Sequence, residues 1–193
     1  MTSEQTAPAA IRFVDAHTHL HAASLRAHRS RFLGDLASVH VSAVVINGTS
    51  ENDWPDVAEF CTGKSGDTSA VIQSEITFVP SFGLHPWNVG NRTPDWERQL
   101  TLRLEAHPHA GIGEIGLDRW MIDRARSDDP RLTGLRRAPL EEQIDVFRRQ
   151  LCLAAEQNRA ASIHCLDAFG PLYDVLRSIA RPVYPLRYSR RPG

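Results

Sequence analysis

Two histidines separated by a single residue, His17 and His19, follow a run of apolar residues near the start of the chain. Alternate residues of a β-strand project from the same face, about 6.7 Å apart along the strand, so both imidazoles can reach one metal ion. Asp15 has the same parity and could orient an imidazole or join the site. A pair of surface histidines at a strand end is the simpler interpretation. The metal site is favoured because the preceding apolar residues predict a buried strand, in which paired imidazoles need partners; these residues are Ile11, Phe13 and Val14.

A second candidate is Glu114, which lies in the sequence Gly-Ile-Gly-Glu-Ile-Gly-Leu-Asp of residues 111–118. A carboxylate inside an apolar strand is costly unless it is paired or bound to a cation, and the glycines permit the close backbone approach of a crowded site. The alternative is a strand terminus at which Glu114 faces solvent. Together with the histidine pair, the pattern favours a metal ligand.

His164 ends a further apolar run, Ala-Ser-Ile-His. A lone histidine in such a place is usually a structural group, but the carboxyl ends of parallel barrel strands open onto one face, where His17, His19 and Glu114 also lie. Cys165 has the opposite parity, so it is predicted to point away from the site and to be inert.

His85 stands in the turn Phe-Gly-Leu-His-Pro-Trp of residues 82–87, near the same rim. It is a candidate for contact with the substrate or a phosphate, and a turn histidine bonded to backbone is an equal alternative. The five remaining histidines are predicted to be solvated: His21, His28, His40, His107 and His109.

Histidine and carboxylate ligands without a thiolate suit zinc, manganese, cobalt or magnesium and do not separate these metals. Two ions bridged by one carboxylate suit phosphoester hydrolysis. Glu114 is the natural bridge, with His17 and His19 on one ion and His164 on the other.

The apolar pattern alternates between short strands and longer helices. Strands are expected at Ile11–Ala16, Val41–Ile46, Ile76–Ser81, Ala110–Gly116 and Ala160–Ile163. Helices are expected at Ser30–Val39, at Asp53–Cys61, from Thr93 as N-cap, from Pro139, and over Leu172–Ile179. Residues 119–138 are expected to form a long loop.

Strict alternation predicts an α/β protein with a parallel sheet and right-handed crossovers. The chain of 193 residues supplies five units and the start of a sixth, whereas an eight-unit barrel usually needs about 250 residues. Residues 11–181 are therefore expected to form either an incomplete TIM-type (βα) barrel or an open α/β sheet. Residues 1–10 are expected to form a disordered leader, and residues 182–193 a basic Pro/Arg tail.

Composition adds limits on partners and location. The net charge of −1 gives no general attraction to a polyanion, and three cysteines without a CxxC motif suit a reducing, cytoplasmic compartment. The sequence contains no apolar stretch of 18 residues, so no membrane span is predicted. Oligomeric state is left open.

The chain resembles the TatD family of metal-dependent hydrolases. The resemblance rests on Val-Asp15-Ala-His17-Thr-His19, Gly83-Leu-His85-Pro-Trp, Gly113-Glu114-Ile-Gly-Leu-Asp118, the helix with Gln143, Phe147, Gln150 and Leu151, and Ser162-Ile-His164-Cys. It implies a (βα) barrel with two divalent ions that hydrolyses phosphodiesters, typically DNA from the 3′ end. It also implies that His17 and His19 hold the first ion, Glu114 bridges, His164 holds the second, and His85 lies near the substrate mouth.

The resemblance also implies a further histidine and a water-activating aspartate, for which residues 181–193 offer no counterpart. The second metal site is therefore expected to be incomplete, and the general base is unassigned. Three alternatives to an active nuclease remain open. They are a non-catalytic remnant that binds metal weakly, a small-molecule amidohydrolase, and a nucleic-acid-binding protein acting through the arginine tail.

Overall fold

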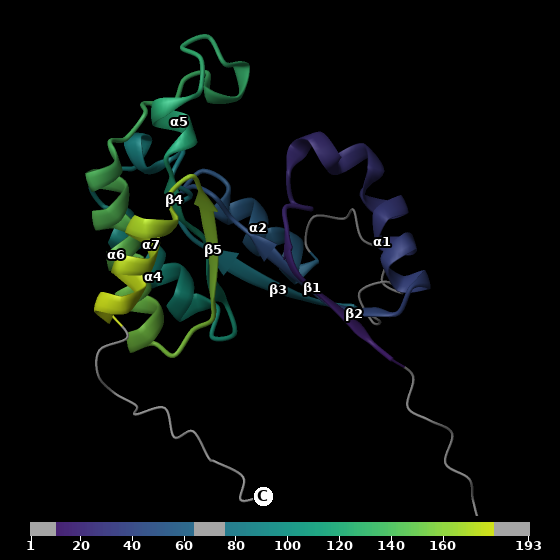
Figure 1. Cartoon of the computed structure of the whole chain (residues 1–193). Coiled ribbons are helices and arrows are strands. Elements are labelled where there is room, and N and C mark those ends of the chain that lie inside the picture. Colours follow the sequence, from purple (N-terminus) through teal and green to yellow (C-terminus); the bar gives the residue numbers. More distant parts are fainter. Residues whose placement is uncertain (1–10, 64–75, 180–193) are drawn as a thin grey trace, which may run out of the picture.

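The computed structural model describes residues 11–63 and 76–179, and the predicted leader and basic tail lie outside these residues. It forms a five-stranded parallel sheet in the order β1-β2-β3-β4-β5 (Figure 1). The strands are β1 (Phe13–Thr18), β2 (Val41–Asn47), β3 (Thr77–Phe82), β4 (Gly111–Asp118) and β5 (Ala161–Leu166). The predicted incomplete βα barrel is confirmed.

Helices follow the strands in alternation. They are α1 (Arg29–Ser38), α2 (Trp54–Thr62), α4 (Trp96–Ala106), α5 (Trp120–Asp123), α6 (Leu140–Glu156) and α7 (Phe169–Ile179), with short 3₁₀ turns η1 (Ala23–His28), η2 (Val89–Asn91) and η3 (Pro130–Leu132). In Figure 1, α4, α6 and α7 lie together on one side of the sheet, while α1 lies beside β1 and β2. The apolar face of α6 contributes Val146, Phe147 and Leu151 to the core. This burial helps to hold β4 in place because α6 packs directly on β4.

Two local predictions need correction. Helix α4 begins at Trp96 with Asp95 in the N-cap position, so Thr93 is not the cap. Its hydroxyl instead donates a hydrogen bond of 2.5 Å to Glu51 Oε1. The expected loop 119–138 contains α5 and η3, and it is anchored because Met121 is fully buried.

Every strand extends further toward its carboxyl end than the sequence predicts. β1 runs through His17 to Thr18, β4 to Asp118 and β5 past His164 to Leu166. His17, Asp118 and His164 therefore lie at strand ends rather than on loops, which restricts their positions more tightly, and His19 directly follows β1.

The expectation that the first strand is buried is wrong. Ile11, Phe13 and Val14 are 74%, 55% and 62% exposed. The physical reason is position: β1 is at the edge of the sheet and pairs only with β2 in the described part of the chain. A strand with one neighbour buries less of its surface than an internal strand does.

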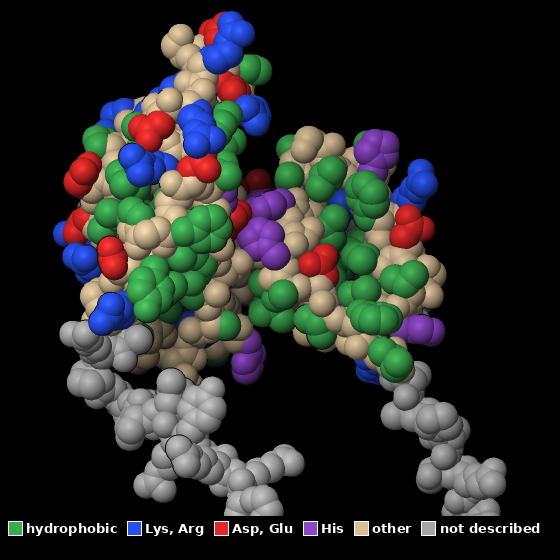
Figure 2. Space-filling model, in the orientation of Figure 1, with side chains coloured by type: hydrophobic (Ala, Val, Ile, Leu, Met, Phe, Trp, Pro, Cys, Tyr) green, Lys and Arg blue, Asp and Glu red, His purple; other side chains and the backbone are tan. Residues whose placement is uncertain are grey.

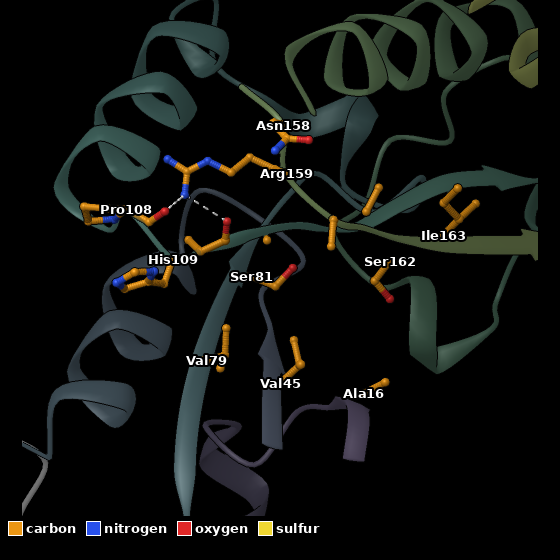
Figure 3. A pocket seen from close by; sticks show the side chains of 14 residues that line it. Ala16, Val45, Val79, Ser81, Pro108, His109, Asn158, Arg159, Ser162 and Ile163 are labelled. Carbon is orange, nitrogen blue, oxygen red and sulfur yellow. Dashed lines mark hydrogen bonds between the residues drawn. The ribbon is translucent and has the colours of Figure 1, made fainter. Parts of the chain in front are cut away.

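The sheet curves as part of a barrel wall, and its concave side carries a hollow of about 620 Å³ (Figure 3). Small and β-branched side chains line it, among them Ala16, Val45, Val79 and Ser162 from four strands. At one end, the Arg159 guanidinium donates hydrogen bonds to carbonyl oxygens of the loop before β4, including Ala110 at 3.2 Å. Within the described residues, no helix has the length and apolar character needed to cross a membrane.

Candidate metal centre

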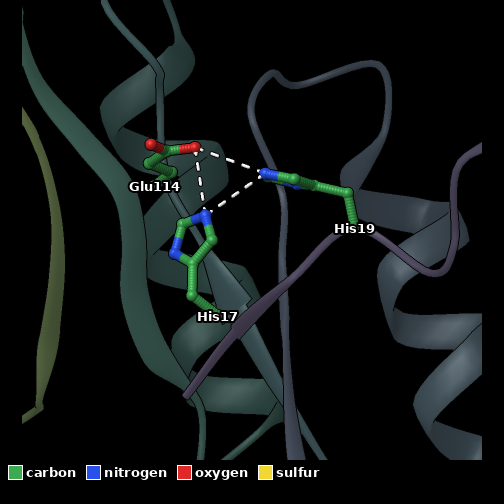
Figure 4. A group of neighbouring side chains, drawn as sticks. All are labelled: His17, His19 and Glu114. Carbon is green, nitrogen blue, oxygen red and sulfur yellow. Dashed lines mark hydrogen bonds and ion pairs between the residues drawn. The ribbon is translucent and has the colours of Figure 1, made fainter. Parts of the chain in front are cut away.

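Three side chains converge where β1 and β4 end, and we call them the outer group: His17, His19 and Glu114 (Figure 4). The two Nε2 atoms lie 3.3 Å apart, and each lies 3.4 Å from Glu114 Oε2. An ideal tetrahedral ion separates its ligands by about 1.63 times the bond length, or about 3.3–3.4 Å for zinc bonds of about 2.0–2.1 Å. The spacing of these three atoms therefore fits one face of a tetrahedral site.

The remaining ring nitrogens of the outer group are already engaged. His17 Nδ1 lies 2.7 Å from the Ser162 hydroxyl, and His19 Nδ1 donates to the Asn47 carbonyl oxygen at 2.7 Å. A neutral imidazole that donates from Nδ1 presents a lone pair at Nε2. When both rings are neutral with the proton on Nδ1, three electron-pair donors face one point, which suits a cation.

A second set of side chains meets the other oxygen of Glu114, and we call it the inner group: His85, Glu114 and His164. His164 Nδ1 lies 3.1 Å from Glu114 Oε1, and His85 Nε2 lies 3.9 Å from the same oxygen. The rings of His85 and His164 are in edge contact, with centroids 4.3 Å apart. One carboxylate therefore lies between two sets of imidazoles.

His85 differs from the other imidazoles in its hydrogen bonding. Its Nδ1 accepts a hydrogen bond of 3.2 Å from the Trp87 amide, so the neutral ring carries its proton on Nε2. Burial, reinforced by the nearby His164, lowers the pKa of His85 to about 4. His85 is therefore a neutral hydrogen-bond donor directed at the site, and its Nε2 has no free lone pair for a metal.

Charge in the centre is concentrated on Glu114 and its partners. Burial opposes ionisation of Glu114, but hydrogen bonds from His164 and His19 outweigh it and hold its pKa well below the usual range. Burial likewise opposes protonation of His164, yet hydrogen bonds to Asp118 and Glu114 raise its pKa to about 9. The hydrogen bond to Glu114 raises the pKa of His19. Without a metal, protons balance this carboxylate.

Close packing of β4 on β5 brings Glu114 and His164 together. Gly116 has φ +147°, and a Cβ there would overlap the carbonyl oxygen of His164. A Cβ on Gly113 would lie 2.7 Å from Ser162 Cβ. The predicted role of these glycines in close backbone approach is confirmed at both positions.

The structure brings together five residues that the sequence singles out: His17, His19, His85, Glu114 and His164. Their roles as ligands or substrate contacts remain predictions. Asp15 does not join them, because its carboxylate accepts from the backbone amide of His17. In Figure 2, histidine side chains gather in the hollow between the part with β1 and α1 and the part with α4, α6 and α7.

Sequence reasoning missed two polar residues at this centre and misplaced a third. Asp118 is fully buried against His164, and Ser162 supports His17.

His21, expected in solvent, is only 7% exposed, and its Nε2 lies 3.6 Å from Asp53 Oδ2. His21 continues the two-residue spacing of His17 and His19, and this pattern could have indicated that it lies near them. His107 is half-buried against Phe82, whereas His28, His40 and His109 are exposed as expected.

Parallel strands alternating with helices, together with imidazoles and a carboxylate at the strand ends, define a βα-barrel protein with groups able to bind metal. The family model described as TatD related DNase matches residues 14–186. The chain belongs to the TatD family.

Individual proteins and solved structures are also similar to this chain. The Cut9-interacting protein scn1 of Schizosaccharomyces pombe is 26% identical over 210 residues, which cover 84% of this chain and 58% of scn1. The 3′-5′ RNA nuclease TATDN2 of Homo sapiens is 31% identical over 107 residues, or 55% of this chain and 12% of TATDN2. The crystal structure of YJJV, a TatD homolog from Escherichia coli, matches with a TM-score of 0.64 at 22% identity, covering 86% of this chain and 56% of YJJV. The chain thus spans little more than half of scn1 and of YJJV.

Proposed function

We propose that the protein is a divalent-metal-dependent phosphodiesterase that acts on nucleic acid. The observation that carries the proposal is the position of Glu114, whose two oxygens face different sets of imidazoles. Oε2 faces His17 and His19, whereas Oε1 faces His164. A carboxylate in this position is suited to bridge two ions, an arrangement common among phosphoester hydrolases.

The donor set fits such ions by its chemistry. In the outer group, His17 Nε2, His19 Nε2 and Glu114 Oε2 would hold one ion, and their spacing supports a tetrahedral preference such as that of zinc. Glu114 Oε1 and His164 Nδ1 would hold the second. Divalent ions held there supply Lewis acidity, lower the pKa of water and offset the negative charge of a phosphoryl group.

Two further side chains, His85 and Asp118, lie beside these ligands and differ in what they can do. The neutral His85 donates a hydrogen bond from Nε2 to a phosphate oxygen, a role that its buried position near Glu114 supports. Asp118 is not the general base, because its carboxylate already receives three N–H groups and is fully buried. The general base remains unassigned among the described residues.

The substrate class follows from the relatives. The family model is described as a DNase, and TATDN2 is named as an RNA nuclease that acts in the 3′-5′ direction. We therefore take a polynucleotide with a free 3′ end as the substrate. DNA is placed first, since the resemblance of the site motifs implies it.

The test is metal-dependent release of nucleotides from 5′-labelled DNA and RNA oligonucleotides, with EDTA as the blank. We expect Zn²⁺ or Mn²⁺ to support shortening from the 3′ end, and His17→Ala and Glu114→Ala to lose at least a hundredfold in rate. His28→Ala is the matched control, because this histidine is exposed and belongs to neither group. Turnover that survives in both site variants would refute the proposal.

A further inference from the structure

The buried carboxylate of Asp118, at the end of β4, occupies a fixed position beside the inner group. It is 0% exposed. Its backbone is held on both sides by the buried amide of Gln143, which accepts from Asp118 N at 2.8 Å and donates to Asp118 O at 3.1 Å. The side chain therefore has little freedom to turn.

Three N–H groups surround this carboxylate. Oδ1 accepts from the Met121 amide at 2.8 Å, Oδ2 accepts from Trp87 Nε1 at 2.6 Å, and His164 Nε2 lies 3.1 Å from the same Oδ2. An ionised carboxylate can only accept hydrogen bonds. The nitrogen of His164 that faces Asp118 must therefore carry a proton.

The consequence appears at the other side of the His164 ring. A neutral imidazole holds one proton, and when it is on Nε2 the lone pair is on Nδ1. Nδ1 is the atom that lies 3.1 Å from Glu114 Oε1. A lone pair and a carboxylate oxygen at this distance repel each other unless a cation or a proton lies between them.

We propose that Asp118 is a positioning residue, which holds the proton of His164 on Nε2 and so presents Nδ1 as the ligand atom of the inner group. The inference rests on the proposed function, because it assigns a metal to that group. Carboxylate–histidine–metal arrangements orient the ring and raise the basicity of the ligating nitrogen. The outer group lacks this device, since neutral oxygens of Ser162 and Asn47 support its two rings.

A purely structural role for Asp118, anchoring Trp87 and the start of α5, predicts a different outcome. In that case Trp87→Phe would reproduce the effect of replacing Asp118, since it removes the shortest hydrogen bond to the carboxylate. If Asp118 positions His164, the ring keeps its partner in Trp87→Phe and loses it only when the carboxylate is changed.

The first test reads the proton directly in the unaltered protein. Long-range ¹H–¹⁵N spectra of histidine-labelled, metal-free chain are recorded from pH 6 to pH 10 and assigned by comparison with His164→Gln. We expect Nε2 of His164 to stay protonated throughout, while Nδ1 is the nitrogen that loses its proton. Loss of the proton from Nε2 first would overturn the inference, and this reading requires neither a metal nor a variant of Asp118.

The second test measures the consequence for metal. Zn²⁺ titrations compare wild type, Asp118→Asn, Trp87→Phe and the control Asp123→Asn, whose carboxylate pairs with Arg119 on the surface. We expect Asp118→Asn to weaken one of two ions by about 10- to 100-fold and to leave the other unchanged. Trp87→Phe and the control should both bind as wild type. Equal binding in Asp118→Asn and the control, or equal weakening of both ions, would overturn the inference.

The two proposals fail separately. A wild-type chain that shortens no oligonucleotide removes the proposed function, and the spectra still decide where the proton of His164 resides. If the spectra show that His164 keeps its proton on Nδ1, the proposed role of Asp118 is wrong, and the nucleotide-release assay still tests the proposed function. If Asp118→Asn does not fold, judged by circular dichroism, the spectra of the wild type remain decisive.

Discussion

The inner and outer groups share Glu114 but differ in how the fold supports them. His17 lies in the edge strand β1 and His19 directly follows it, with side chains 39% and 37% exposed. His164 and His85 are 20% and 11% exposed; His164 lies against the buried Asp118, and the ring of His85 contacts that of His164. The outer group is therefore open to solvent, whereas the inner group is set in a closely packed junction.

The difference separates two requirements of a metal centre. In the outer group the spacing of three electron-pair donors already fits an ion, although β1, which carries His17 and directly precedes His19, is poorly buried. In the inner group, burial and a charged partner fix one imidazole, and the second imidazole is a hydrogen-bond donor. Correct spacing does not require deep burial, whereas control of the ring proton depends on a buried partner.

The largest effect on stability is expected at Gly116, where β4 meets β5, and it tests whether the inner group lies in a closely packed junction. Gly116→Ala places a Cβ against the carbonyl oxygen of His164 and strains a φ of +147°. We expect a loss of about 3 kcal/mol or more in the free energy of unfolding, measured with urea. Gly134→Ala is the control, because Gly134 also has a positive φ but no atom within 4 Å of the added Cβ. Equal losses would show that the junction is not closely packed.

The second prediction compares one histidine from each group. In the metal-free protein, His164→Ala should cost about 2–3 kcal/mol, because it leaves the buried Asp118 without one of its donors and removes a partner of Glu114. His17→Ala should cost less than about 1 kcal/mol, since its ring is partly solvated. Urea unfolding in EDTA measures the loss in the free energy of unfolding for each variant. Equal losses would show that the fold supports the two groups equally.

The sequence predicted the alternation of strands and helices and the approach of the five site residues. It could do so because strand parity and the common carboxyl end of parallel strands are local and topological rules. It failed for Ile11, Phe13 and Val14, because whether a strand is internal or at an edge depends on which strands pair with it.

Asp118 and His21 illustrate the other limit. Asp118 follows Glu114 by four residues at the end of the same strand, and no pattern indicates that a distant Trp87 and His164 will donate to it. The burial of His21 depends on contact with Asp53 from the next βα unit. Hydrogen-bond partners are set by the tertiary fold, which spacing alone does not reveal.

The third prediction uses pH to isolate the inner group in the metal-free protein. The pKa of His164 is about 9 in the folded chain and near 6.5 when unfolded, because its hydrogen bonds to Asp118 and Glu114 outweigh burial. The folded state therefore holds the proton more tightly. Stability from this group is fully present below pH 6.5 and is lost as the pH rises through 9.

The free energy of unfolding of the wild type should fall by about 2 kcal/mol between pH 6.5 and pH 9.5. His164→Gln should lose much less over the same interval, and it serves as the control. A wild type and variant with parallel pH profiles would show that His164 is not held by its two carboxylate neighbours.

The smallest expected effect concerns the support of the outer group. Ser162→Ala removes the hydroxyl that lies 2.7 Å from His17 Nδ1, but water can replace it because the ring is 39% exposed. We expect the outer ion to bind about tenfold more weakly, at the lower end of what such supporting contacts contribute, with the inner ion unchanged. Zn²⁺ titration measures this, with Ser178→Ala as the control because its hydroxyl donates to the α7 backbone carbonyl of Val175. A loss as large as that in Asp118→Asn would mean that a neutral, partly solvated partner controls its imidazole as strongly as a buried carboxylate does.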